Sequence, residues 1–110
     1  MAGPRYRVLL HADFADDLGQ LPRNVARRIL DAVEDRLGQA PDQYGERLRK
    51  SLHGFWKLRV SDYRVVFEIL GTEVRVYGAM HRRQVYEKIL RRLEQGWTGP
   101  RGPGRTGAPS

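Results

Sequence analysis

Three cationic side chains, Lys57, Arg59 and Arg64, lie close together in the stretch GFWKLRVSDYRVVFEI, residues 54–69. Ammonium and guanidinium groups bind phosphate oxygens, and two guanidinium groups can donate to one phosphate from different sides. Whether these three side chains reach the same phosphate depends on the elements that carry them. The first question is therefore which way each side chain points.

The stretch predicts a β-hairpin whose two strands are joined by a two-residue Ser-Asp turn. Such a turn pairs Val60 with Tyr63 and Arg59 with Arg64. Side chains alternate between the two faces of a strand. Because the apolar pair must point toward a core, both arginines are expected to point outward, with Lys57 two residues along on the same face.

Like charges directly opposite each other on a sheet are unfavourable, and favourable cross-strand pairs contribute only about 0.2–1 kcal/mol. A bound phosphodiester would remove the repulsion between Arg59 and Arg64 and would use both as donors. The alternative is that Glu68, on the same face, and solvent screening make the repulsion trivial. The geometry favours the first interpretation, in which Arg59 and Arg64 bind a phosphodiester.

The whole sequence predicts one α+β domain with the order β-α-α-β-β-β-α. It has a small, largely antiparallel four-stranded sheet, a helical hairpin near the N-terminus packed on one face, and a C-terminal helix. Asp13 is expected to cap the first helix, and the apolar stripe of the last one is expected to hold Tyr86, Ile89, Leu90 and Leu93. The predicted strands are residues 5–11, 55–60, 63–70 and 73–79, and the longer helices are residues 22–37 and 82–96.

Residues 1–95 are expected to form this domain. Residues 96–110 contain eight Gly or Pro among 15 and predict a disordered tail. No signal peptide and no apolar run long enough to cross a membrane is visible, so the chain is expected to be cytoplasmic.

The formal net charge is +7, from 20 Lys and Arg against 13 Asp and Glu. Such a surplus attracts nucleic acid, an anionic membrane or an acidic protein. A soluble surface with an arginine-rich composition is the alternative. The chain has no cysteine, and its three histidines are not in a metal-ligand pattern, so no metal or other cofactor is expected.

The sequence LHGFWKLRVSDYRVVFEI, followed by a strand and then HRRQVYEKI, resembles the RelE/ParE superfamily of toxin–antitoxin toxins over roughly residues 5–94. The resemblance implies a RelE-like fold. In the RelE branch it implies a toxin that enters the ribosomal A site and cleaves mRNA without a metal, by attack of a ribose 2′-hydroxyl on the adjacent phosphate. Such a reaction needs a base, cations around the phosphate and an acid for the leaving oxygen.

Matched to that family, the basic residues of the hairpin are Lys57, Arg59 and Arg64, the later arginine is Arg82, and the tyrosine is Tyr86. The resemblance implies that Arg64 stabilises the phosphate and that Arg82 assists it or donates on the acid side. Tyr86 would stack on or orient a base of the codon. Lys50 and Arg83 complete the expected RNA-binding set.

One departure concerns the general base, because this chain has Arg59 where RelE carries a second lysine. A guanidinium stays protonated and cannot act as a base. The base is then Lys57, if its cationic neighbours lower its pKa, or His81. His81 has the alternative role of ending the last strand, Tyr86 that of core packing, and Arg82 that of contacting only an antitoxin.

Two other functions remain open on the same fold. The first is a ParE-like inhibitor of DNA gyrase, a binding module and not an enzyme. The second is a regulatory partner that mainly binds its antitoxin. In each case the resemblance implies a cognate antitoxin with an acidic amphipathic segment, and weak self-association of the toxin. The ribosome and mRNA are partners only in the endoribonuclease hypothesis.

Overall fold

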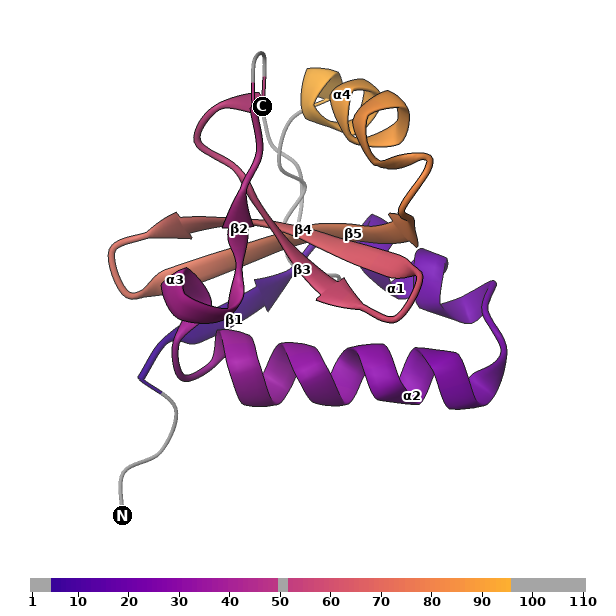
Figure 1. Cartoon of the computed structure of the whole chain (residues 1–110), viewed down its shortest axis with the longest axis horizontal. Coiled ribbons are helices and arrows are strands. Elements are labelled where there is room, and N and C mark those ends of the chain that lie inside the picture. Colours follow the sequence, from indigo (N-terminus) through magenta and orange to yellow (C-terminus); the bar gives the residue numbers. More distant parts are fainter. Residues whose placement is uncertain (1–4, 50–51, 96–110) are drawn as a thin grey trace.

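The computed structural model describes residues 5–49 and 52–95 (Figure 1). The predicted tail, residues 96–110, and Lys50 lie outside the described residues. The elements, in chain order, are β1 (Arg7–Leu10), α1 (Ala12–Gly19), α2 (Arg23–Ala32), the π-helical segment η1 (Val33–Leu37), α3 (Pro41–Tyr44), β2 (Glu46–Arg47), β3 (Trp56–Val60), β4 (Tyr63–Leu70), β5 (Glu73–His81) and α4 (Val85–Gln95).

The sheet has the strand order β1-β5-β4-β3-β2. Strand β1 runs parallel to β5 and the other pairs are antiparallel, so the expected α+β class and largely antiparallel sheet are confirmed. The described sheet has five strands, not the predicted four. The additional strand, β2, pairs only Glu46 with Lys57 and Arg47 with Trp56, which is too short to give an alternating sequence pattern.

The register of the β3–β4 hairpin is the predicted one, with Arg59 opposite Arg64 and Val60 opposite Tyr63. Ser61, the first residue of the turn, has a φ of 58°. A positive φ at this position gives the turn the backbone twist that two-residue hairpins require, although it disfavours any residue with a side chain. The turn residues therefore fix which residues of β3 and β4 share a face.

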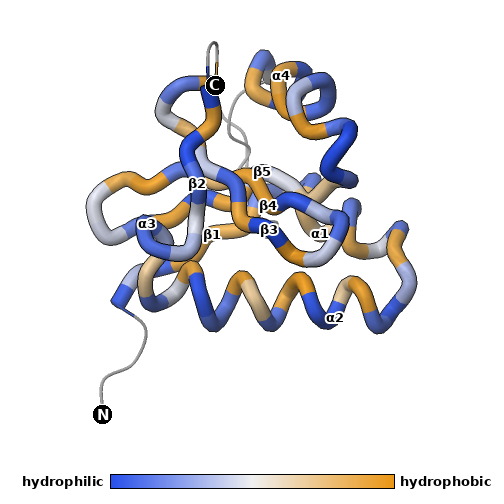
Figure 2. The backbone as a smooth tube through the Cα atoms, viewed as in Figure 1, coloured by the Kyte–Doolittle hydropathy of each residue, from blue (hydrophilic) through white to orange (hydrophobic). Residues whose placement is uncertain are grey.

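The N-terminal helices cover one face of the sheet, where the first core forms (Figure 1). The apolar residues of α2 and η1 recur at helical spacing, and this alternation of hydrophobic and hydrophilic residues is visible along the tube in Figure 2. The buried members of this core are Phe14, Ile29, Val33, Leu37, Leu58, Val60, Val65, Phe67, Val74, Val76 and Ala79. The predicted inward-facing residues of the hairpin all belong to this core or pack against it.

Helix α4 lies on the opposite face from α2, so helices cover both faces of the sheet (Figure 1). The second core joins Val66 of β4 to Val85 and Ile89 of α4. Tyr86 and Leu90, expected on the buried stripe, have exposed fractions of 43% and 38%. Ile89 and Leu93 of the predicted stripe do pack into this core, whereas Tyr86 and Leu90 turn outward, because Val85, Ile89 and Leu93 recur at the four-residue spacing that faces the sheet.

The first helix begins at Ala12, and its N-cap is His11, not the predicted Asp13. The backbone N–H of Asp13 donates to His11 Nδ1 at 2.9 Å. The Asp13 carboxylate instead lies 3.6 Å from Nε of Arg92. An imidazole therefore performs the capping that the sequence assigned to a carboxylate.

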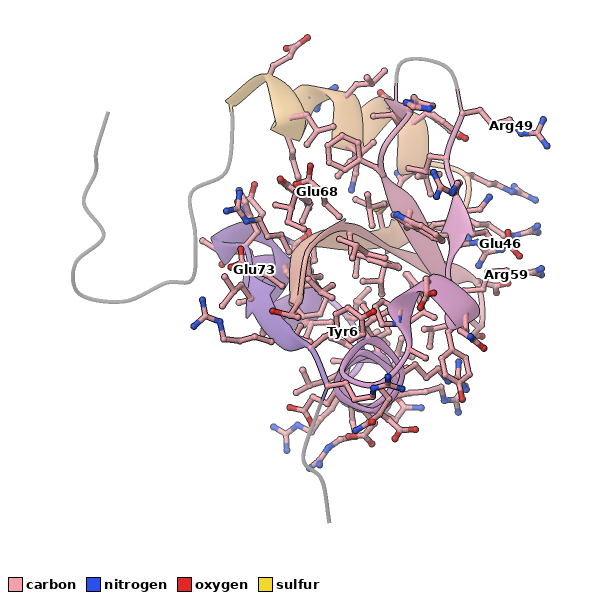
Figure 3. The ribbon with its side chains drawn as sticks, turned by 90° about the vertical axis from the view of Figure 1, so that its left-hand side faces the viewer. Tyr6, Glu46, Arg49, Arg59, Glu68 and Glu73 are labelled. Carbon is pink, nitrogen blue, oxygen red and sulfur yellow. The ribbon has the colours of Figure 1, made fainter. Side chains whose placement is uncertain are left out.

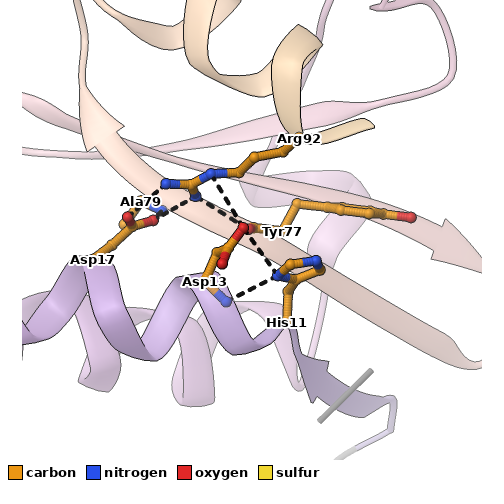
Figure 4. Close-up of polar contacts among 6 residues, drawn as sticks. All are labelled: His11, Asp13, Asp17, Tyr77, Ala79 and Arg92. Atoms are coloured by element: carbon orange, nitrogen blue, oxygen red, sulfur yellow. Dashed lines mark hydrogen bonds and ion pairs between the residues drawn. The ribbon is translucent and has the colours of Figure 1, made fainter. Parts of the chain in front are cut away.

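Arg92 of α4 is clamped by Asp17 of α1 across the edge of β5 (Figure 4). Its Nη1 and Nη2 each donate to one Asp17 carboxylate oxygen at 2.7 Å, and Asp17 Oδ2 also accepts from the backbone N–H of Ala79 at 2.8 Å. A Cβ at Gly78 would collide with the Arg92 guanidinium. The glycine thus leaves room for the ion pair that holds α4 on the sheet.

Within the described part of the chain, no helix is both long and apolar enough to cross a membrane. Those same residues contain no group of three or more His, Cys, Asp or Glu arranged to hold a metal ion.

Candidate functional site

Strands β3 and β4 bring Lys57, Arg59 and Arg64 to the same face, as the register requires. Lys57 lies opposite Val66, a residue of the core under α4, so this face is the one that α4 partly covers. Arg82, in the segment after β5, joins the three. We name Lys57, Arg59, Arg64 and Arg82 the cationic face.

Arg64 is the most enclosed member of the cationic face, with an exposed fraction of only 9%. Its Nη1 donates to the backbone carbonyl of Tyr63 at 2.8 Å and to that of Ser61 at 3.0 Å. It makes no ion pair with a carboxylate among the described residues. This enclosure differs from the expectation that both arginines point freely outward, because the side chain folds back onto the turn.

Burial is the largest effect on the pKa of Arg64 and lowers it from its usual value. The neighbouring charges of Arg59 and Arg82 lower this pKa further, whereas Glu46 and Asp62 raise it. The guanidinium nevertheless stays charged at working pH. Arg59 and Arg82 thus lie close enough to Arg64 to repel it, and an anion that bound beside Arg64 would relieve this repulsion.

Arg82 is held beside this position by the hairpin turn. Its backbone N–H donates to the carbonyl of Asp62 at 2.9 Å, and its Nε lies 3.9 Å from Asp62 Oδ1. Half of the Arg82 side chain is exposed, so the ion pair leaves the guanidinium accessible. The structure thus brings Arg82 together with the hairpin arginines, as predicted.

Glu46 is a member of the site that the sequence did not reveal. It pairs directly with Lys57 across the β2–β3 ladder, and it projects on the same side of the molecule as Arg59 (Figure 3). The two-residue strand that carries it gives no periodic signal, and its stretch reads as a loop. A carboxylate therefore lies at the outer border of the cationic face.

His81 lies on the other face of the sheet. It pairs with Tyr63, and the two rings meet edge to face with centroids 5.8 Å apart. His81 also lines a small pocket with α1 residues, on the side of the first core. The strand alternation that puts Met80 into the core under α4 therefore separates His81 from Arg64.

Tyr86 and Arg83 lie near the start of α4. Tyr86 is exposed, and no hydrogen bond of its hydroxyl is found within residues 5–49 and 52–95. This exposure excludes the core-packing alternative for its side chain. Arg83 is exposed, and its backbone N–H donates to His81 Nδ1 at 3.2 Å.

The fold and the site together define a class of protein. It is a small α+β domain with a mixed sheet, helices on both faces of the sheet, and cationic side chains on one of these faces. The family model described as ParE toxin of type II toxin–antitoxin system, parDE, matches residues 8–86. The chain belongs to this family, and the expected RelE/ParE superfamily membership is confirmed. No curated protein sequence matches the chain significantly.

Solved structures of toxin–antitoxin systems share the fold. The toxin–antitoxin complex RelBE2 from Mycobacterium tuberculosis is 27% identical, with a TM-score of 0.67, covering 72% of this chain and 99% of that chain. The RelB–RelE antitoxin–toxin complex from Methanococcus jannaschii is 22% identical, with a TM-score of 0.57 and coverage of 73% and 96%. The chromosomal ParDE system from P. aeruginosa is 16% identical, with a TM-score of 0.59 and coverage of 70% and 96%.

Proposed function

We propose that this toxin is a metal-independent endoribonuclease that cleaves mRNA in the ribosomal A site. The observation that carries the proposal is Arg64, an enclosed guanidinium without a carboxylate partner among the described residues, flanked by Arg59 and Arg82. A phosphate oxygen that gains negative charge in a pentacovalent transition state is stabilised by such preorganised donors. The resemblance to RelE hairpins supports RNA as the substrate.

In the proposed reaction the ribose 2′-oxygen attacks the adjacent phosphorus and loses its proton to a base. The bond from phosphorus to the 5′-oxygen of the next nucleotide breaks, and that oxygen takes up a proton. The products are a 2′,3′-cyclic phosphate and a free 5′-hydroxyl, so no oxidant and no water is consumed. Arg59 and Arg64 hold the phosphate, and Arg82 donates a hydrogen bond on the leaving-group side.

Lys57 is the proposed base. The sequence left Lys57 and His81 open, and His81 lies on the opposite face of the sheet, against Tyr63. Lys57 shares the face of Arg59 and Arg64, and a lysine can give up its proton whereas a guanidinium cannot. Tyr86, exposed on the first turn of α4, is proposed to stack on a base of the codon.

We also propose a cognate antitoxin as the partner of this toxin. The Mycobacterium tuberculosis and Methanococcus jannaschii structures are complexes of a toxin with an antitoxin. An acidic segment that covers the cationic face would relieve the repulsion among its arginines and block access of RNA. The ribosome is proposed as a second partner, because the reaction takes place in its A site.

The test is primer extension on mRNA from ribosomes incubated with the purified toxin. We expect new 5′ ends within A-site codons, and no cut in the same mRNA without ribosomes. The variant Arg64→Ala should lose the cuts, whereas Arg91→Ala, which removes an exposed arginine of α4 paired with Glu87, should keep them. Cuts that persist in Arg64→Ala would remove the proposal.

A second candidate is inhibition of DNA gyrase on the same fold. Two observations favour it: the matching family is that of ParE toxins, and the imidazole of β5 lies away from the cationic face. A gyrase inhibitor needs a binding surface but no general base. Supercoiling by purified gyrase that stops at a stoichiometric amount of toxin, with mRNA intact on toxin-treated ribosomes, would establish this function in place of the nuclease.

A further inference from the structure

We propose that a groove between α2 and β3 binds the RNA strand beside the reacting phosphate, an inference that rests on the proposed function. The groove has a volume of about 860 Å³. Its charged lining consists of Arg27, Arg28, Asp31, Asp35 and Arg36 from the helical side and Arg59 from the strand. Four guanidinium groups against two carboxylates give the groove a net positive charge, which suits a phosphodiester backbone.

The groove is continuous with the cationic face through Arg59. Arg59 lies opposite Arg64 on the sheet and also lines the groove. Because β2 pairs only with residues 56 and 57, the second half of β3 has no outer partner strand among the described residues. The Arg59 side chain, exposed at this open edge, therefore connects the cationic face to the helical side (Figure 3).

The groove arginines form no ion pair within the described residues, a property that they share with Arg64 and with several exposed arginines of the domain. Arg27, Arg28 and Arg59 pair with no carboxylate within the described residues, although Asp31 and Asp35 line the same groove. The arginines that do form ion pairs lie on β1, β5, α4 and the segment between the last two, and they are Arg7, Arg75, Arg82, Arg91 and Arg92. The positive charges of the groove are thus available to a ligand.

The length of the groove fits several nucleotides. Arg28 and Arg36 are eight residues apart, which corresponds to about 12 Å along a helix. A stacked strand advances about 3.4 Å per phosphate, so this distance spans three to four phosphates. An RNA that reaches Arg64 with its reacting phosphate and passes Arg59 would place the neighbouring phosphates along α2.

An acidic segment of a protein partner is the competing occupant. Asp31 and Asp35 disfavour any anion, but they disfavour a carboxylate-rich peptide and an RNA alike. Continuity with Arg59 and Arg64 favours RNA, because a strand cleaved at Arg64 must extend past the reacting phosphate, and the groove begins at Arg59 beside it. The groove arginines are therefore assigned to flanking phosphates, without contact to the reacting atoms.

The experiment measures binding of a short fluorescent single-stranded RNA to the full chain over a range of salt concentrations. The double variant Arg27→Ala/Arg28→Ala is compared with Arg23→Ala/Arg91→Ala, which has the same net charge but removes exposed helix arginines that do not line the groove. Alanine favours the helix, so both variants should fold. The RNA-binding constant falls with salt, and each lost phosphate contact should reduce the steepness of log binding constant against log salt concentration by about 0.7. We therefore expect a reduction of about 1.4 for the groove variant and little change for the control.

A second pair of variants tests the sign of the effect. Asp31→Asn/Asp35→Asn should strengthen RNA binding more than Asp42→Asn/Glu94→Gln, which changes the net charge equally outside the groove. Equal slopes for the groove and control variants would overturn the inference. So would a groove variant that keeps RNA affinity but loses binding to the antitoxin, because the occupant would then be protein.

The two proposals fail in different ways. If wild-type toxin cleaves ribosome-bound mRNA and Arg64→Ala does not, while the groove variants match their controls, only the groove assignment is wrong. If the wild-type toxin neither binds RNA nor cleaves mRNA, the proposed function is wrong, and the groove assignment is wrong with it.

Discussion

Arg64 and Arg92 are both largely enclosed arginines on the α4 side of the sheet, but their surroundings are opposite. Arg92 donates to both carboxylate oxygens of Asp17, and these hydrogen bonds raise its pKa against the opposing effect of burial. Within residues 5–49 and 52–95, Arg64 donates only to backbone carbonyls, and burial together with Arg59 and Arg82 lowers its pKa. Arg92 is thus paired with a carboxylate, whereas Arg64 forms no ion pair among the described residues, and Glu46 and Asp62 offset its charge only from a distance.

The difference separates a structural arginine from the one proposed to bind the phosphate. A buried charge that is paired and hydrogen-bonded holds two elements together, and removing one partner is costly. An enclosed cation surrounded by like charges destabilises the free protein, and this arrangement becomes favourable only when an anion binds. Enclosure alone therefore does not identify a functional residue, and it is the lack of an ion pair among the described residues that supports the role proposed for Arg64.

The largest expected effect on stability is that of Arg92→Ala. Among the residues that the structure describes, the substitution leaves the Asp17 carboxylate, whose side chain is 12% exposed, with only the backbone N–H of Ala79 as a partner. We expect a loss of about 3 kcal/mol in the free energy of unfolding, measured in urea. The control Arg91→Ala removes an exposed ion pair and should cost less than about 0.5 kcal/mol. Equal losses would show that the clamp does not hold α4.

Gly78→Ala tests the same clamp from the sheet side. The added Cβ would collide with the Arg92 guanidinium and would lie 2.9 Å from Asp17 Oδ2. We expect a loss of about 2 kcal/mol in the free energy of unfolding. In the Arg92→Ala background the loss should fall to less than half, because the two sites interact directly. A full loss in that background would assign the glycine another role.

Ser61→Gly tests the turn beside Arg64. Glycine accepts the positive φ of 58° without the penalty of a Cβ, and this gain exceeds its entropic cost by about 0.5 kcal/mol. The backbone carbonyl that accepts from Arg64 is kept. Thermal unfolding should therefore shift upward slightly with cleavage unchanged, and a destabilised variant would show that the serine hydroxyl matters.

The smallest expected effect on stability is that of the ion pair between Arg75 and Glu73, at the start of β5. A hydrogen bond from Arg75, whose Nε lies 2.7 Å from Glu73 Oε2, lowers the pKa of the Glu73 carboxyl below its usual value of 4.5. A lowered pKa adds stability above pH 4.5, and this stability is lost as the pH falls through the folded-state pKa. The stability difference between wild type and Glu73→Gln should therefore shrink in acid urea titrations, and a constant difference would contradict the assignment.

The sequence was sufficient to predict the register of the β3–β4 hairpin and the face on which each of its side chains lies, because two constraints agree there. A two-residue turn fixes the register, and the apolar residues of β3 and β4 fix which face is buried. Together they correctly place Arg59 opposite Arg64. The same reasoning was half right for α4. It placed Ile89 and Leu93 correctly, but packing on Val66 turns Val85, and not Tyr86, toward the sheet.

The parts that sequence reasoning missed depend on contacts between distant positions. Asp17 and Arg92 are separated by 75 residues, and the sequence around either residue gives no indication that the two form an ion pair. Glu46 reaches the cationic face through a strand of two residues. His81 is the last residue of β5, a strand that was expected from the sequence to end at residue 79, so the face on which the His81 side chain lies was not predicted.

The central claim is that Arg64 is available for a ligand whereas Arg92 is committed to the fold. The most direct test is single-turnover cleavage of ribosome-bound mRNA by Arg64→Ala and Arg92→Ala, at a temperature at which both variants are folded by circular dichroism. We predict that Arg64→Ala cleaves about 100-fold more slowly, as expected for loss of a preorganised donor to the transition state. Arg92→Ala should cleave at close to the wild-type rate. Equal rates for the two variants, or slower cleavage by Arg92→Ala, would contradict the account.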